Sequence, residues 1–485
     1  MIVIGKTADR REIGLPLKYA NRHGLVTGST GSGKTVSLQL LAEGFSRAGV
    51  PVFAADVKGD LSGIAKAAEA RGKAQDRAEG MQVAWWPEAT PTRLWDVHRV
   101  HGLPVQTSAD RIGPLILGRM LGLNQIQDGT LAIAFKRAAD NGHGHLDLDD
   151  IRSELADMLD MRAETCSQYG NITASSISAI QREILALEAQ GAADLFAEPG
   201  LDIRDLMEVR DGRGVVNLLH ADTLMESPKL YACLLLWLLT ELFRVLPEAG
   251  DLDKPKLVFF FDEAHLLFRD APPKLLQTIE RVVRLVRSKG VGVYFVTQSP
   301  LDVPDAVQAQ LGNRIQHTLR AYSPKDQRMV RASAKAFRPN KGVDVQTLIT
   351  TMPVGSALVS FLHADGVPSP VEYVKVLPPR GQLGPISDIE REAILLADPL
   401  RLRYASGAGE AEMARAFTKR WRSERGLPAL PEMTVPYQPG EWMNYLPDLS
   451  EPDLTPKARA GAITSIVWNG ALAACCFWFA AKVLL

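Results

Sequence analysis

The sequence predicts an α/β protein with a mainly parallel central sheet. A short strand pattern at 24–27 runs through a glycine-rich turn into a helical pattern at 36–46. Continuous apolar runs follow, and such runs are typical of strands that helices cover on both faces. These runs lie at 50–55, 214–219, 256–261 and 292–297. Helical patterns separate them, as strand–helix–strand units of a parallel sheet require.

The remaining elements follow from the same patterns, taken in order. Residues 1–7 predict a first strand, because the apolar run is too short for a signal peptide and continues into charged residues. Residues 231–246, 274–289 and 305–311 predict helices. Later strands are expected at 314–319, 357–362 and 371–377.

The glycine-rich turn matches the pattern G-x-x-x-x-G-K-[ST] in full. Its residues are Gly28, Ser29, Thr30, Gly31, Ser32, Gly33, Lys34 and Thr35. In such a P-loop the backbone N–H groups surround phosphates, the lysine reaches the β and γ phosphates, and the hydroxyl of the last residue binds Mg²⁺. A chance match in a Gly/Ser-rich turn is the alternative, but the flanking strand and helix argue against it. The motif therefore predicts nucleotide binding.

An acidic pair, Asp262 and Glu263, directly follows the apolar run at 256–261. An aspartate in this position can hold Mg²⁺ beside Thr35, and the glutamate can orient and deprotonate a water molecule. The alternative is a strand that ends in a capped helix start. Asp56 ends another apolar run, and two interpretations of it remain open: a group near the metal, or a cap of the next helix.

Gln298 follows the next apolar run, where its amide can contact a γ-phosphate or the attacking water. Arg281, Arg284 and Arg287 precede that run at a spacing of three and form a basic stripe on one side of the predicted helix. For any single one of these arginines, the alternative is an ordinary solvated charged face. Several strand–helix units after one P-loop indicate the RecA-like branch of P-loop NTPases. The chain lacks an intact N-K-x-D motif and an LSGGQ motif between the two phosphate motifs, which argues against a GTPase and a transporter ATPase.

Composition shifts divide the chain into five parts. The ATPase domain is expected in two parts, 1–106 and 208–380, around a helical insertion at 107–207. Within the insertion, helices are predicted at 112–121, 130–139, 148–161 and 175–190. A helical and Pro-rich tail (381–461) and an apolar segment (462–485) complete the chain.

The overall charge is close to balanced. The formal net charge is -1, so whole-molecule charge gives no evidence for a polyanionic partner, and a nucleic acid would need a local basic patch. The four cysteines show no zinc-ligand spacing, and a reducing cytoplasm is the expected setting. Residues 463–485 reach the lower length limit for a membrane span. They fit either a membrane anchor or a tail packed on a neighbouring subunit.

Four segments together resemble the HerA/FtsK superfamily of ring ATPases, and most of all the bacterial HerA-like proteins of the YjgR type. The segments are 19–24, 54–60, 260–267 and 287–298, in this order. The resemblance covers about residues 1–425. It implies a homohexamer that binds ATP between neighbouring subunits. It also implies that Arg22 and Arg287 serve the nucleotide, one or both from the neighbouring subunit, with Arg314 as a reserve candidate.

The resemblance implies an ATP-driven ring motor, with DNA as the translocated polymer. Lys34 and the loop amides would bind the phosphates, Thr35 and Asp262 would hold Mg²⁺, Glu263 would activate water and Gln298 would contact the γ-phosphate. The alternative is an ATP-gated scaffold that assembles or switches an effector protein, such as a nuclease, without translocation.

Overall fold

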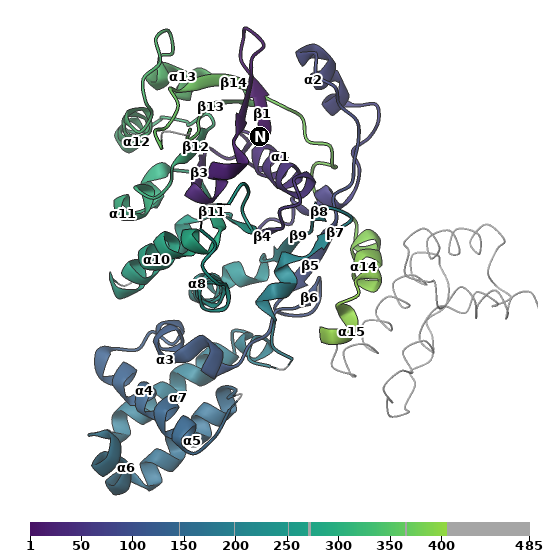
Figure 1. Cartoon of the computed structure of the whole chain (residues 1–485). Helices are drawn as coiled ribbons and strands as arrows, with labels where there is room; N and C mark the ends of the chain where they lie inside the picture. Colours follow the sequence, from purple (N-terminus) through teal and green to yellow (C-terminus); the bar gives the residue numbers. More distant parts are fainter. Residues whose placement is uncertain (145, 198, 251, 270–272, 364–365, 405–485) are drawn as a thin grey trace, which may run out of the picture.

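The computed structural model describes residues 1–404 except 145, 198, 251, 270–272 and 364–365. Its centre is a twelve-stranded sheet (Figure 1). In spatial order the strands are β2 (Glu12–Leu15), β1 (Ile2–Lys6), β14 (Glu372–Val376), β13 (Ser356–Ser360), β12 (Asn313–Gln316), β3 (Gly24–Thr27), β11 (Val291–Thr297), β10 (Leu257–Phe261), β4 (Val52–Asp56), β9 (Val216–His220), β5 (Thr92–Asp96) and β6 (Leu103–Pro104). A separate short hairpin joins β7 (Val209–Arg210) and β8 (Arg213–Gly214).

The sheet is parallel from β12 through β6 and antiparallel at the other end. The predicted α/β fold with a mainly parallel sheet is confirmed. The first strand of the chain, β1, pairs with β2 and β14 in antiparallel fashion, so it lies outside the parallel part. In the parallel part β11 lies between β3 and β10, and the glycine loop and the acidic pair therefore follow strands on either side of β11.

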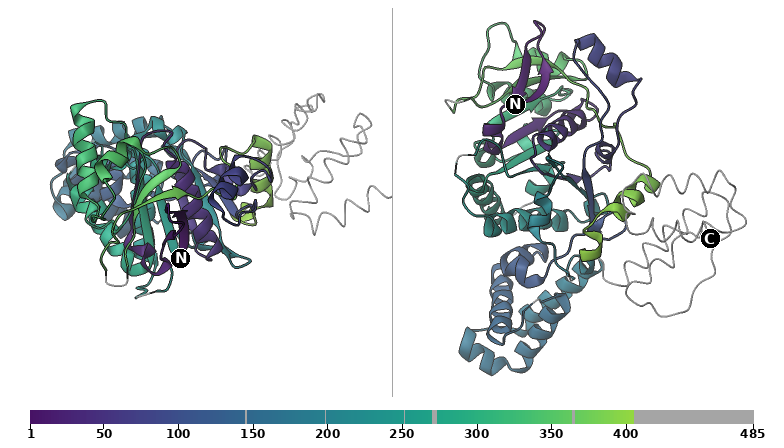
Figure 2. Two further views of the ribbon diagram at one scale, coloured as in Figure 1. Left: turned by 90° about the horizontal axis from the view of Figure 1, so that it is seen from above. Right: turned by 45° about the vertical axis from the view of Figure 1, so that its right-hand side comes forward.

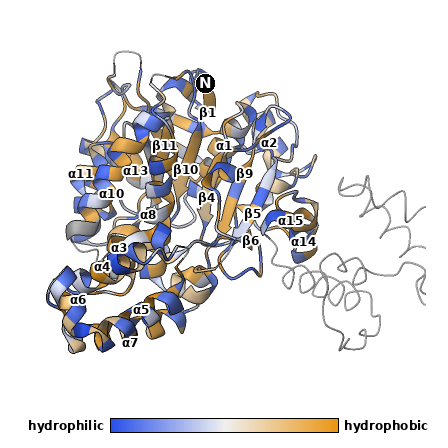
Figure 3. Cartoon of the chain, turned by 60° about the horizontal axis from the view of Figure 1, so that its bottom comes forward, coloured by the Kyte–Doolittle hydropathy of each residue, from blue (hydrophilic) through white to orange (hydrophobic). Residues whose placement is uncertain are grey.

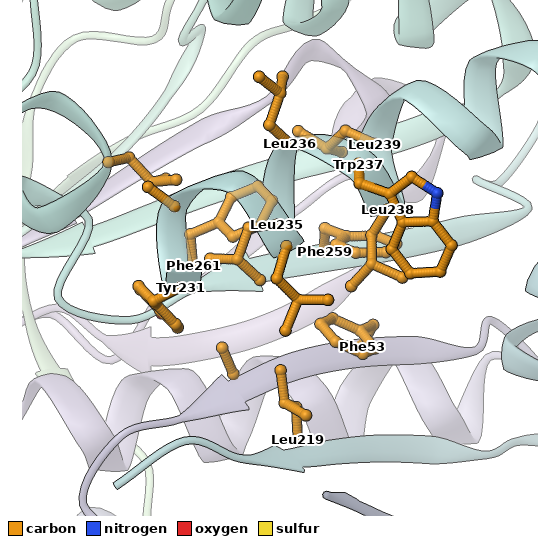
Figure 4. Close-up of a cluster of buried hydrophobic side chains, with 14 of the residues drawn as sticks. Phe53, Leu219, Tyr231, Leu235, Leu236, Trp237, Leu238, Leu239, Phe259 and Phe261 are labelled. Atoms are coloured by element: carbon orange, nitrogen blue, oxygen red, sulfur yellow. The ribbon is translucent and has the colours of Figure 1, made fainter. Parts of the chain in front are cut away.

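Helices cover both faces of the parallel strands. On one face, Phe45 of α1 (Lys34–Arg47) packs on Phe260 of β10, with ring centroids 6.2 Å apart. On the other face, α8 (Pro228–Val245) lies over Phe259 and Phe261 (Figure 4). Successive side chains of a strand point to opposite faces, so the Phe-Phe-Phe run of β10 serves both layers. Figure 3 shows the resulting hydrophobic colouring of β4, β10 and β11.

The α8 face carries further helices that connect the parallel strands. They include α9 (His265–Phe268), α10 (Pro273–Val286) and α11 (Asp305–Gln308). After β12 come α12 (Pro324–Lys335) and α13 (Val345–Thr351), and α2 (Lys73–Met81) lies beyond β4 in the sequence. Short 3₁₀ helices are η1 (Leu17–Arg22), η2 (Ser62–Ala65), η3 (Ala192–Asp194), η4 (Ile203–Met207), η5 (Thr223–Glu226), η6 (Arg287–Lys289) and η7 (Pro300–Asp302).

The predicted insertion contains a group of helices that stands apart from the sheet (Figures 1 and 2). The helices are α3 (Ala109–Met120), α4 (Gln125–Asp140), α5 (Leu148–Asp160), α6 (Arg162–Tyr169) and α7 (Ala174–Glu188). All four helical stretches expected from the sequence are present, and α6 was not predicted. Asn124 and Asp147 cap α4 and α5 through capping boxes, which explains why these helices begin there.

The chain after β14 returns across α1 to the far end of the sheet. Glu43 of α1 accepts hydrogen bonds from the N–H groups of Arg380 and Gly381, both at 2.9 Å. Two helices follow, α14 (Asp388–Ala397) and α15 (Arg401–Tyr404), and buried Asp398 between them accepts from Arg93 Nε of β5 at 2.7 Å. The start of the predicted tail is thus packed on α1 and the end of the sheet that holds β5.

The apolar segment 463–485 lies outside the described residues, and so does the rest of the predicted tail beyond residue 404. Within the described part of the chain, no helix combines the length and the apolar character that a bilayer span needs.

Candidate nucleotide site

The glycine loop connects β3 to α1 at the carboxyl edge of the parallel strands. Gly28, Gly31 and Gly33 have φ values of 159°, 76° and 107°, of which the last two lie well inside the left-handed region that favours glycine. Lys34 begins α1, so the free N–H groups of the helix N-terminus lie directly at the loop. The buried Lys34 Nζ donates to the carbonyl oxygens of Gly28 and Ser29 at 2.5 and 3.2 Å.

The residues directly after β12 form hydrogen bonds with the glycine loop and with the end of β3. His317 N donates to Thr27 O at 2.7 Å, and Ser29 N donates to Thr318 O at 2.9 Å. His317 Nδ1 lies 3.0 Å from Ser356 O and Nε2 lies 2.9 Å from Ser37 Oγ. Burial lowers the pKa of His317 to about 4, so the ring is neutral and can donate to the carbonyl while accepting from the hydroxyl.

His317 also explains why the loop begins with glycine. A Cβ added to Gly28 would lie 2.5 Å from the Cβ of His317, which is too close for any side chain. The role of this histidine could not be predicted from the sequence, because a single histidine at the end of a strand carries no local signal of what it contacts.

The acidic pair lies at the carboxyl end of β10, two strands from the loop. Asp262 is buried, and Tyr231 OH of α8 donates to its carbonyl oxygen at 3.0 Å. Burial and the neighbouring Glu263 carboxylate raise the pKa of Asp262 to about 6. Glu263 has a φ of +46°, a left-handed conformation that is uncommon for a non-glycine residue and often marks functional sites.

Glu263 is held by three side chains from other segments. Its Oε1 accepts from Lys58 Nζ at 2.8 Å, and its Oε2 lies 3.4 Å from Gln298 Nε2 and 3.3 Å from His265 Nδ1. Burial alone would raise the pKa of Glu263, but the hydrogen bond and charge of Lys58, together with Gln298 and His265, lower the pKa. The structure therefore brings Glu263 and Gln298 together, as the sequence predicted, and adds Lys58.

The turn after β4 completes the acidic side of the site. Asp60 Oδ2 lies 3.4 Å from Thr35 Oγ1. Asp56 Oδ2 accepts from Leu61 N at 3.1 Å, so Asp56 closes this turn and lies at the site. Burial, together with the charges of Asp60 and Asp262, raises the pKa of Asp56 to about 7. The bond to Leu61, which precedes η2, agrees with the cap interpretation, and the effect of the Asp262 charge agrees with a place near the acidic pair, so the structure fits both interpretations.

The residues present fit a triphosphate and Mg²⁺. Ser32 Oγ and Asp56 Oδ1 are buried and have no hydrogen-bond partner among the described residues. Burial and mutual repulsion raise the pKa values of Asp56 and Asp262, and a bound divalent cation would stabilise the charged form of both carboxylates. Oxygen ligands from Thr35 and the aspartates suit Mg²⁺, which prefers oxygen and retains several waters.

The three candidate arginines lie away from this chain's own loop. Arg22 ends η1 before β3, and Arg287 begins η6 before β11, so both lie at the amino edge of the sheet. The seven residues of β11 alone span about 20 Å. Arg314 lies within β12, where it lines a small cavity with Pro300 and Phe337. None of the three joins the loop and the acidic pair within this chain.

Replacing Asp56 with asparagine is expected to raise the melting temperature of the protein by a few degrees in EDTA without nucleotide. The pKa of Asp56 is about 7 in the folded state and about 4 in the unfolded state, so folding of the native protein is penalised as the unfolded carboxylate ionises. The gain should therefore grow between about pH 4 and 7 and stay constant above that. Thermal unfolding measured across this range checks it. The exposed Asp253→Asn variant is the control, and a gain that shrinks with rising pH would contradict the assignment.

Residues 2–418 match the family described as Helicase HerA-like C-terminal, which is well over half of the chain. The structure is similar to plasmid coupling protein TrwB in complex with the GTP analogue GDPNP, with a TM-score of 0.54 and 15% identity over 80% of this chain and 92% of that chain. It is also similar to TrwB in complex with ADP and Mg²⁺, with a TM-score of 0.51 and 16% identity over 79% of this chain and 90% of that chain.

No curated protein matches the chain. The TrwB likenesses concern the fold, and the family match covers both parts of the nucleotide site. The chain therefore belongs to the family described as Helicase HerA-like C-terminal, and it is a P-loop ATPase that uses ATP and Mg²⁺.

Proposed function

We propose that the protein is an ATP-driven motor that acts on DNA as a ring of identical subunits. Lys34 and the loop N–H groups bind the phosphates, and Thr35 and Asp262 hold Mg²⁺, which neutralises charge on the β and γ phosphates. Glu263 takes a proton from the attacking water, the water oxygen bonds to the γ-phosphorus, and the bond to the leaving ADP oxygen breaks. Gln298, whose exposed amide lies beside Glu263, orients that water.

The position of Arg22 and Arg287 supports a ring, because both arginines lie at the edge of the sheet opposite the glycine loop. A head-to-tail contact between copies can place the amino edge of β11 from one subunit against the glycine loop of the next. Arg287 and Arg22 would then complete the neighbour's site by stabilising charge on the transferring phosphoryl group. A homohexamer, the expected ring size, would contain six such contacts.

The observation that supports DNA as the partner is a basic surface on α12. Between 324 and 341 the chain has six lysines and arginines and one acidic residue, in a chain whose net charge is -1. Arg328, Arg331 and Lys335 are exposed, and their spacing of three and four residues places them on one helix face. Within the described part of the chain, no ion pair neutralises any of the three. Such a stripe is typical of phosphate-backbone contacts.

The basic surface is coupled to the nucleotide loop. Arg320 N donates to Ser29 Oγ at 2.9 Å, and this segment leads into α12. Tyr322 lies between Arg320 and α12, and it is 86% exposed. Exposed aromatic rings beside basic residues suit contacts with nucleic acid. A displacement of the glycine loop during hydrolysis would therefore move the surface that contacts DNA.

Duplex DNA is expected to stimulate the ATPase, and the Arg328→Gln, Arg331→Gln double variant is expected to lose most of that stimulation while keeping its basal rate. Each lost phosphate contact lowers the salt slope of DNA binding by about 1, so the slope should fall by about 2. Steady-state ATPase rates with and without DNA, over a range of salt, measure both effects.

The matched control is Arg71→Gln with Lys73→Gln, which removes the same charge from another exposed site. Undiminished stimulation in the α12 variant would show that α12 is not the contact. A wild-type protein indifferent to DNA would favour the scaffold that switches an effector protein.

A further inference from the structure

Lys58 makes an ion pair with the glutamate that serves as general base. Lys58 Nζ lies 2.8 Å from Glu263 Oε1, and the two residues come from the ends of neighbouring strands, β4 and β10. The side chain of Glu263 is 5% exposed, whereas that of Lys58 is 46% exposed. The base is thus covered on its Oε1 side by a cation that reaches in from the surface.

This arrangement is unfavourable for proton abstraction. A general base must offer a free lone pair to the water it deprotonates, and its efficiency falls as its basicity falls. Here a cation binds Oε1, while Gln298 and His265 lie against Oε2. We propose that Lys58 holds Glu263 in an inactive state and that its release from Glu263 accompanies loading of the metal site.

The turn that carries Lys58 also contacts a residue of the metal site. Asp60 Oδ2 lies 3.4 Å from Thr35 Oγ1, the hydroxyl assigned to Mg²⁺. Thr35 donates its proton to Asp60, so its oxygen lone pairs are free for the metal, and a Mg²⁺ ion bound there would lie beside the Asp60 carboxylate and attract it. Because Asp56 closes the same turn by accepting from Leu61 N, a shift of Asp60 acts on Lys58 through a short, braced segment. Because the side chain of Lys58 is 46% exposed, water can solvate its ammonium group when it leaves Glu263.

The inference rests on the proposed role of Glu263 in ATP hydrolysis. Lys58→Met is expected to raise the basal kcat, without DNA, by about threefold or more and to leave KM for ATP unchanged, because the wild-type protein must open the ion pair in every turnover before its base can act, and this step limits the basal rate. Lys58→Arg should restore the wild-type rate. The control is Lys66→Met, since Lys66 is a similarly exposed lysine that pairs with Glu390 at 2.6 Å, away from the site. An unchanged or lower kcat in Lys58→Met would overturn the proposal.

A second measurement follows Lys58 itself. Amine-reactive labelling with mass spectrometry gives the reaction rate of Lys58 relative to Lys66. We expect this ratio to rise at least about twofold when Mg²⁺ and a non-hydrolysable ATP analogue are added, and not when EDTA replaces Mg²⁺. Glu263→Gln should show the faster rate without nucleotide. An unchanged or slower rate of Lys58 with Mg²⁺ and analogue would overturn the release step.

The two proposals fail separately. If Glu263→Gln hydrolyses ATP normally, Glu263 is not the base, and the proposed roles of Glu263 and Lys58 both fall. If Glu263→Gln is inactive while Lys58→Met behaves as wild type, the ATPase assignment stands and the inactive state held by Lys58 does not.

Discussion

Replacing Glu263 with glutamine is expected to lower ATP turnover at least about a hundredfold while ATP still binds. Glutamine is nearly the same size as glutamate and can keep its contact with Gln298, but it cannot take a proton from water. The phosphate contacts of the glycine loop do not involve this side chain. Single-turnover hydrolysis gives the chemical step, and equilibrium binding of a fluorescent ATP analogue gives the affinity.

The control is Glu390→Gln, which removes a carboxylate that pairs with Lys66 on the surface. It should hydrolyse ATP as the wild type does. A normal rate in Glu263→Gln would exclude Glu263 as the base. A loss of ATP binding would instead mean that the substitution disturbs the strained backbone at φ +46°.

The central strands and the phosphate motifs could be predicted because their signals are local. A run such as Leu257–Phe261 is apolar at every position, and a strand buries all of these side chains only when helices cover both of its faces. The glycine loop needs its residue types within eight positions, so the pattern is complete in the sequence. The pairing of β11 with both β3 and β10 then places Gln298 beside Glu263 without further information.

Residues that act across long sequence separations could not be predicted. His317 contacts Ser37 across 280 positions, and Lys58 contacts Glu263 across 205. A single histidine and a single lysine have no periodicity that would reveal these contacts. The return of the chain over α1 depends in the same way on Glu43 and Gly381, 338 positions apart. The basic stripe of α12 is different, because its spacing is visible in the sequence although the balanced charge of the whole chain gives no sign of it.

The two ends of β11 lie at opposite edges of the parallel part of the sheet. β11 ends directly before Gln298, which lies beside this chain's own acidic pair, and begins after η6, whose first residue is Arg287, at the opposite edge. One buried strand therefore joins Gln298, the residue proposed to contact the γ-phosphate, to the arginine proposed to serve the neighbouring subunit. A rigid strand transmits small displacements along its length, so hydrolysis in one site would shift the arginine offered to the next. This arrangement makes Arg287 the most informative residue for the oligomer.

Arg287→Ala is expected to lower turnover by about a thousandfold, the loss typical of a missing arginine finger, while assembly and ATP binding remain intact. Mixing it with Glu263→Gln subunits should restore activity. In a randomly mixed head-to-tail ring, about a quarter of the interfaces combine an intact Glu263 with a neighbour's intact Arg287. Light scattering measures assembly, and ATPase rates across mixing ratios measure recovery.

The control for this mixing experiment is Arg287→Ala mixed with the double variant Glu263→Gln, Arg287→Ala, which offers no intact arginine and should stay inactive. The same design applied to Arg22→Ala separates the two arginines, because only an arginine that acts on the neighbour's phosphate allows recovery. If neither variant recovers activity although both assemble, the arginines do not act between subunits. The amino edge of β11 would then have another role, and the ring contact proposed here would have to place a different surface against the glycine loop.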